Sequence, residues 1–173
     1  TGKCVAPIAI PIVTHGLHGV GAAMAAQRLG EDSVTVVFMG DGATSEGDAH
    51  EALNLASVFV APCVFFVQNN QWAISVPVAR QQAGPTLAHR AAGYGMPGVR
   101  VDGNDVLACY AVVEDAAARA RAGGGPTFID TASGPVVISV VSSGDVPLYS
   151  TSVNTRVDTK EVQDFLAPYL ALH

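Results

Sequence analysis

Short apolar runs alternate with longer, mixed stretches along most of the chain. The runs predict four strands, at residues 34–39, 63–67, 99–101 and 127–131. Continuous apolar segments of this length, rich in β-branched residues, are typical of strands buried on both faces of a parallel sheet. The stretches between them predict helices over residues 14–29, 46–59, 86–94 and from 104 or 105 to about 121. This alternation favours an α/β fold with a doubly wound, mostly parallel sheet.

Local signals refine this pattern in two places. Ser45, with Asp48 three residues later, resembles a capping box and predicts the start of the 46–59 helix. Residues 71–85 contain prolines and glycines and are predicted to form a loop.

The alternation stops near the end of the chain, so we expect two regions. Residues 1–134 would form the folded core, and residues 135–173 a divergent C-terminal tail. Within the tail, the apolar run 136–141 predicts either a strand or an exposed, aggregation-prone segment. Residues 159–172 are consistent with a short terminal helix.

Composition narrows the classes of function. The 173 residues are 49% hydrophobic and 14% charged, with a net charge of −6 and no basic run. Such a chain is expected to be globular, to bury surface against other subunits and not to bind nucleic acid. No apolar stretch is long enough to predict a membrane-spanning helix. Three widely spaced cysteines, Cys4, Cys63 and Cys109, indicate thiols in a reducing compartment, so a cytoplasmic location is expected.

Polar residues follow two consecutive predicted strands. Asp41 lies between Gly40 and Gly42 after the first strand, and Asn69 and Asn70 follow the second. Ligands of parallel sheets bind beyond the carboxyl ends of the strands. The helix that begins nearby offers free N–H groups that favour phosphate. A carboxylate and an amide oxygen beside a phosphate suit Mg²⁺, so this edge is predicted to hold a magnesium-bridged diphosphate. For Asp41 alone, an acidic turn is an equally good interpretation.

The spacing of these residues leads to a family resemblance. GDG, then 26 residues, then Asn69 and Asn70 resembles the thiamin diphosphate motif. The stretch GDGATSEGDAHEALNLASVFVAPCVFFVQNNQWAISVPVARQ resembles the alpha subunit of the decarboxylating component of 2-oxo acid dehydrogenase complexes. The resemblance extends over roughly residues 8–131. It implies the thiamin diphosphate-binding fold, here truncated at both ends.

The resemblance also implies roles for individual residues. The expected magnesium ligands are the Asp41 carboxylate, the Asn70 side-chain oxygen and the Trp72 backbone carbonyl. The residues expected to line the diphosphate are Gly40, Gly42 and Ala43. Ile12 and Ile74 match apolar positions near the aminopyrimidine ring.

For function, the resemblance implies oxidative decarboxylation of a 2-oxo acid with thiamin diphosphate and Mg²⁺. The acyl group would pass to a lipoyl domain of the acyltransferase component. A beta subunit would complete the site in an assembly with two copies of each chain. We slightly prefer a branched-chain 2-oxo acid over pyruvate as substrate.

One residue departs from the family pattern. Val136 stands where the family has a histidine that assists acyl transfer, and valine can neither donate nor accept a proton. We therefore name no catalytic residue, and turnover by this polypeptide alone is not expected. The alternative is an interaction module that packs on a beta subunit without turning over. A dinucleotide-binding oxidoreductase is disfavoured, because no G-x-G-x-x-G turn is followed by a ribose-binding acid.

Two further groups of residues have spacings that are found in metal-binding sites. His15 and His18 stand three residues apart without an evident third ligand, so a helix surface or a contact at the cofactor edge is preferred. Asp102 and Asp105 lie in an acidic loop, which we interpret as a turn and a helix cap.

Overall fold

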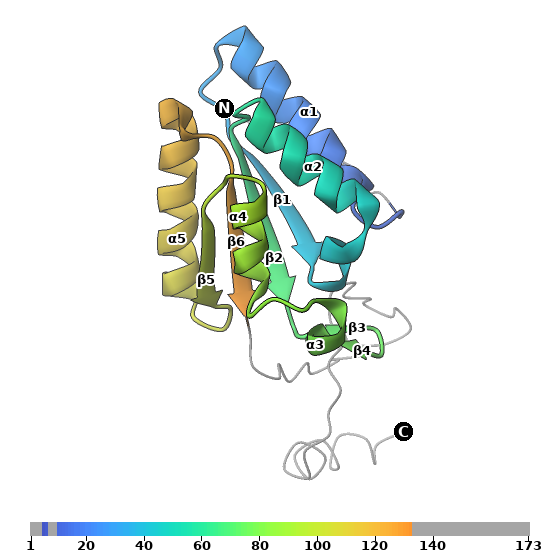
Figure 1. Ribbon diagram of the computed structural model, residues 1–173. Helices are drawn as coiled ribbons and strands as arrows, with labels where there is room; N and C mark the ends of the chain where they lie inside the picture. Colours follow the sequence, from blue (N-terminus) through green and yellow to red (C-terminus); the bar gives the residue numbers. More distant parts are fainter. Residues whose placement is uncertain (1–4, 7–9, 133–173) are drawn as a thin grey trace, which may run out of the picture.

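The computed structural model describes residues 5, 6 and 10–132, and its centre is a parallel sheet of four strands (Figure 1). The strands are β1 (Thr35–Gly40), β2 (Cys63–Asn69), β5 (Gly98–Asp102) and β6 (Thr127–Ala132). Their order across the sheet is β1-β2-β6-β5, with every neighbouring pair parallel. Each lies within two residues of a predicted strand, so the α/β, mostly parallel fold is confirmed. The 135–173 tail, including Val136, lies outside the described residues.

Helices cover both faces of this sheet. α1 (Thr14–Leu29) and α2 (Gly47–Val58) lie side by side on one face, and α5 (Val106–Arg119) lies on the other (Figure 1). Successive strand residues point to opposite faces, and the core divides accordingly. Phe65 belongs to the cluster under α1 and α2, whereas its neighbour Val64 belongs to the cluster under α5. None of the described helices is long and apolar enough to cross a membrane.

Small residues let α1 approach β1 closely. A Cβ built on Gly19 would lie 2.5 Å from a methyl carbon of Val37, which is far inside van der Waals contact. A Cβ built on Gly16 would lie 3.5 Å from the Ala52 Cβ of α2, which is ordinary van der Waals contact. Gly19 therefore lets α1 pack closely on β1, and Gly16, Ala23 and Ala26 lie on the buried side of this helix.

β1 differs from its prediction as a strand buried on both faces. Val37 and Met39 are buried under α1 and α2, but Val36 and Phe38 on the opposite face are 36% and 57% exposed. Phe38 contacts the ring of Phe66, with 5.3 Å between the ring centroids. In the described part of the chain, α5 packs mainly on β2, β5 and β6 on this face.

The segment predicted as a loop contains short regular elements. β3 (Trp72–Ala73) and β4 (Val76–Pro77) form an antiparallel hairpin, and α3 (Val78–Gln81) follows at once. Two-residue strands are too short to leave a period-2 pattern, which is why the sequence did not reveal them. The single helix predicted over 86–94 is instead divided into η2 (Leu87–His89) and α4 (Arg90–Gly93).

The sequence predicted N-terminal caps for the helices that follow β1 and β5, and the structure contradicts the first prediction and confirms the second. Residues Gly42–Ser45 form a 3₁₀ turn, η1, and α2 begins behind Glu46 without a side-chain cap. The capping box of Ser45 and Asp48 is therefore wrong, because Ser45 is taken up in the preceding turn. Asp105 does cap α5, since its Oδ1 accepts from the N–H groups of Leu107 and Ala108, both at 3.0 Å.

Candidate cofactor site

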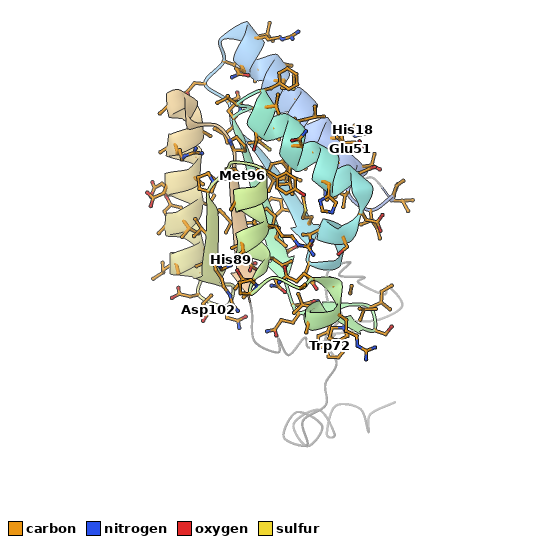
Figure 2. All side chains as sticks on the ribbon, in the orientation of Figure 1. His18, Glu51, Trp72, His89, Met96 and Asp102 are labelled. Carbon is orange, nitrogen blue, oxygen red and sulfur yellow. The ribbon has the colours of Figure 1, made fainter. Side chains whose placement is uncertain are left out.

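The register of β1 and β2 places the predicted site residues at one edge of the sheet. Gly40, the last residue of β1, pairs with Gln68, so Asp41 follows the end of β1 while Asn69 ends the adjacent β2 and Asn70 follows it. Trp72, in the hairpin after Asn70, lies at this same end of the sheet (Figure 2). The expectation that the carboxylate and the amides share the carboxyl edge of the sheet is confirmed.

Asp41 is a buried carboxylate, only 2% exposed. Gln81 donates from Nε2 to its Oδ2 at 2.9 Å. Its backbone carbonyl accepts from the Thr44 hydroxyl at 2.6 Å, which fixes the η1 turn to the end of β1. Within the described ranges, no basic side chain forms an ion pair with Asp41; the ion pair found there joins Arg121 to Asp32.

The electrostatic surroundings of Asp41 favour a proton or a cation. Burial raises the pKa of its carboxyl above the ordinary value of 3.8, and the Asp130 carboxylate raises it further. The hydrogen bond from Gln81, together with backbone hydrogen bonds from Asp41 and Gly42, opposes this shift. A divalent cation would relieve the same unfavourable charge without protonation.

The two glycines beside Asp41 have different environments. A Cβ built on Gly42 would lie 2.5 Å from the Ala73 Cβ, so only glycine lets the β3–β4 hairpin sit against η1. A Cβ on Gly40 would meet no atom within 4 Å. Gly42 therefore shapes the site through packing, whereas the backbone at Gly40 faces open space. The predicted contacts of Gly40, Gly42 and Ala43 with a diphosphate stay predictions.

Asn69 and Asn70 form two successive side-chain turns. The Asn69 Oδ1 accepts from the Gln71 N–H, and the Asn70 Oδ1 accepts from the Trp72 N–H, each at 3.0 Å. Such turns fix the direction of the side-chain oxygens relative to the backbone. Because an amide oxygen carries two lone pairs, the Asn70 Oδ1 can bind a cation and still accept from Trp72. The chain passes through this turn with Gln71 at φ 69°.

Ile12 and Ile74 are apolar side chains in solvent. They are 61% and 83% exposed. The backbone has a positive φ at Val13 (68°), which follows Ile12, and at Ile74 itself (56°). Positive φ is a genuine outlier for β-branched residues, and such strain clusters at ligand sites. Near Ile12, a ring nitrogen of His15 contacts the carbonyl of Phe38 at 2.7 Å, which brings the start of α1 to the end of β1.

The alternative metal groups do not assemble. No set of three or more His, Cys, Asp and Glu side chains is gathered for a metal among residues 5, 6 and 10–132. Asp102 accepts from the Asn104 N–H at 2.9 Å, which together with the Asp105 cap confirms the structural interpretation of that loop.

Four residues that sequence reasoning passed over support the site. Thr44 and Gln81 both bind Asp41, as described above. Arg90 donates from Nη1 to the Thr44 carbonyl and hydroxyl, at 2.6 and 2.8 Å, and from Nη2 to the Gln81 carbonyl at 3.0 Å. Asp130, fully buried on β6, accepts from the Asn69 amide at 2.8 Å. A charged residue inside an apolar strand was the available signal for Asp130; the other three gave none.

Comparison of the sequence with known protein families matches it to one of them. The family model described as "Dehydrogenase E1 component" matches residues 1–133. The chain belongs to this family. The family recognised from the GDG and Asn69–Asn70 motifs is thereby confirmed.

Curated relatives of this dehydrogenase E1 chain carry related names. The "3-methyl-2-oxobutanoate dehydrogenase subunit alpha" of Mycobacterium tuberculosis (strain CDC 1551 / Oshkosh) is 75% identical over 130 residues. The "2-oxoisovalerate dehydrogenase subunit alpha" of Bacillus subtilis (strain 168) is 46% identical over 123 residues. The "Pyruvate dehydrogenase E1 component subunit alpha" of Staphylococcus aureus (strain Mu50 / ATCC 700699) is 40% identical over 136 residues. These matches cover 71–79% of this chain and 35–37% of the relatives, so the chain spans about a third of their length.

Proposed function

We propose that this chain forms the thiamin diphosphate-binding part of the alpha subunit of a 2-oxo acid dehydrogenase. The observation that carries the proposal is the buried carboxylate of Asp41, which lacks a basic partner in the described residues and follows β1, the neighbour of the strand that Asn70 follows. An anionic and an amide oxygen are ligands that Mg²⁺ prefers. The donor set therefore fits a magnesium-bound diphosphate.

Each residue has one task in this proposal. Asp41 and Asn70 bind Mg²⁺ through side-chain oxygens, and Trp72 binds it through its carbonyl. Gly40, Gly42 and Ala43 line the diphosphate, and Ile12 and Ile74 shield the aminopyrimidine ring from water. When bound, the cofactor supplies the electron sink for loss of CO₂ from a 2-oxo acid, and the protein positions it.

The relatives support a substrate class and partners. Two of the three are named for one branched-chain acid, called 3-methyl-2-oxobutanoate in one name and 2-oxoisovalerate in the other, and the third is named for pyruvate. We therefore prefer a branched-chain 2-oxo acid. The words "subunit alpha" in all three names support a beta subunit as partner, in an assembly of two copies of each chain. The acyl group then passes to a lipoyl domain of the acyltransferase component.

Calorimetric titration tests the cofactor assignment. Thiamin diphosphate is titrated into the chain with its beta subunit, with and without Mg²⁺. Binding should depend on the metal, and Asp41→Ala should abolish that dependence. Glu46→Ala is the control, because Glu46 is an exposed acid five residues away. Unchanged affinity of Asp41→Ala would refute the metal site.

Turnover separates the enzyme from the interaction module. The same complex is supplied with 3-methyl-2-oxobutanoate or pyruvate, and release of CO₂ is measured. Faster release from the branched-chain acid is expected. A stable complex that binds the beta subunit and releases no CO₂ would favour the interaction module, for which Val136 at the family's histidine position is the motivation.

A further inference from the structure

The side chain of Gln81 connects the end of α3 to the carboxylate of Asp41. Its Nε2 donates to the Asp41 Oδ2 at 2.9 Å and to the Val76 carbonyl at 3.0 Å. Both N–H groups of the amide are thus used, and the amide is held in one orientation. Its Oε1 is buried and has no hydrogen-bond partner within the described ranges. The two donated hydrogen bonds therefore set the position of this side chain.

Arg90 holds the backbone on both sides of that contact. Its guanidinium binds the Gln81 carbonyl on α3 and the Thr44 carbonyl and hydroxyl on η1. Thr44 in turn donates to the Asp41 carbonyl. A planar guanidinium with fixed donor directions is suited to joining two segments in one geometry. Asp41 is consequently held at its backbone through Thr44 and at its carboxylate through Gln81.

We propose that Gln81 is a positioning residue for the metal ligand: it fixes Oδ2 of Asp41 so that Oδ1 is directed to the cation, and Arg90 keeps Gln81 in place. This inference rests on the proposed function, because it requires Asp41 to bind a metal. Carboxylates that bind metals are themselves hydrogen-bonded, and loss of such a partner typically weakens metal affinity about 10–100-fold. Without the hydrogen bond from Gln81 the Asp41 carboxylate could rotate, and its affinity for the cation should fall by a similar factor.

Mn²⁺ is a suitable probe, because free and bound Mn²⁺ are distinguished by electron paramagnetic resonance. The full chain with its beta subunit is titrated with Mn²⁺ in the presence of thiamin diphosphate. Gln81→Met keeps the length of the side chain and removes its donors, and it should bind Mn²⁺ about 10–100-fold more weakly. Gln82→Met is the matched control, since no hydrogen bond joins Gln82 to Asp41, and it should bind as the unchanged protein does.

A second measurement works without metal. Carbon-13 NMR of the Asp41 carboxyl reports its pKa directly, and Gln81→Met should raise that pKa, whereas Gln82→Met should leave it unchanged. A role of Gln81 limited to holding α3 would not move this value. Should Gln81→Met fail to fold, Gln81→Asn keeps the amide but is one methylene too short to reach Oδ2. Weaker Mn²⁺ binding by that variant supports the proposal, and retained binding overturns it.

The outcomes separate the two claims. If Asp41→Ala loses Mn²⁺ while Gln81→Met binds it normally with an unchanged Asp41 pKa, only the positioning role is overturned. If Asp41→Ala binds Mn²⁺ as tightly as the unchanged protein, or if the unchanged protein does not bind it, the proposed function fails and the positioning role fails with it.

Discussion

Replacement of Gly42 by alanine tests how the hairpin is seated against the end of β1. The added Cβ would lie 2.5 Å from the Ala73 Cβ and 3.4 Å from its Cα. The first distance is more than 1 Å below van der Waals contact, and both atoms are attached rigidly to backbone, so the hairpin must move. Overpacking of this kind costs about 1–3 kcal/mol. We expect Gly42→Ala to lower the free energy of unfolding by that amount.

A double-mutant cycle measures the clash itself. Ala73→Gly removes the opposing methyl group, so the Gly42→Ala/Ala73→Gly pair should recover most of the loss, with a coupling energy of about 1–3 kcal/mol. Gly40→Ala is the control, because its Cβ meets no atom within 4 Å. Urea unfolding of the full chain, followed by circular dichroism, gives each value.

The reasoning would be refuted by a Gly42→Ala chain as stable as the unchanged one. It would equally be refuted by a coupling energy below about 0.5 kcal/mol, which is the range of independent sites. Either result would mean that the hairpin does not rest on Gly42. In the expected case, the variant should also bind thiamin diphosphate more weakly, because Trp72 and Ile74 would move with the hairpin.

Three other changes have defined outcomes. Asp130→Ala removes the carboxylate that accepts from the buried Asn69 amide and should cost about 1–3 kcal/mol in urea unfolding. Because the pKa of Asp41 is raised on folding, the metal-free chain should lose stability as pH rises from about 3.8 through the folded-state pKa; Asp41→Asn should remove this dependence in melts with chelator. Burial raises the pKa of the Cys63 thiol to about 12, so peptide mapping at pH 8 should find Cys63 unalkylated by iodoacetamide until the chain unfolds.

The sheet was predictable because its strands leave a strong apolar signal. The runs at 34–39 and 63–67 are long enough to identify β1 and β2, and their order in the chain implies a parallel pair. The exposure of Val36 and Phe38 was not predictable, because a hydrophobic run does not say which helix covers which strand. The hairpin and the 3₁₀ turn were missed for another reason: each is closed by hydrogen bonds between residues a few positions apart, and such short elements leave no periodic pattern.

Part of the site was predictable because it lies at the ends of these strands. Asp41 and Asn70 are recognisable as polar residues that follow apolar runs, and the motif spacing identifies their family. Gln81 and Arg90 do not, because a glutamine 40 residues after Asp41 and an arginine 46 residues after Thr44 carry no local pattern. Their contacts exist only after β1, α3 and α4 have folded together.

The hairpin of two-residue strands has a consequence for the breathing motions of the protein. Asp41 is anchored to a four-stranded sheet, but the β3–β4 ladder is too short to be stable by itself. The local unfolding that costs the least free energy should therefore release Trp72, Ile74 and Gln81 while the sheet stays folded. Hydrogen exchange would then show the amides of β3 and β4 exchanging long before those of β2. A ligand that enters this edge would contact a rigid sheet on one side and, on the other, a hairpin that can refold around it.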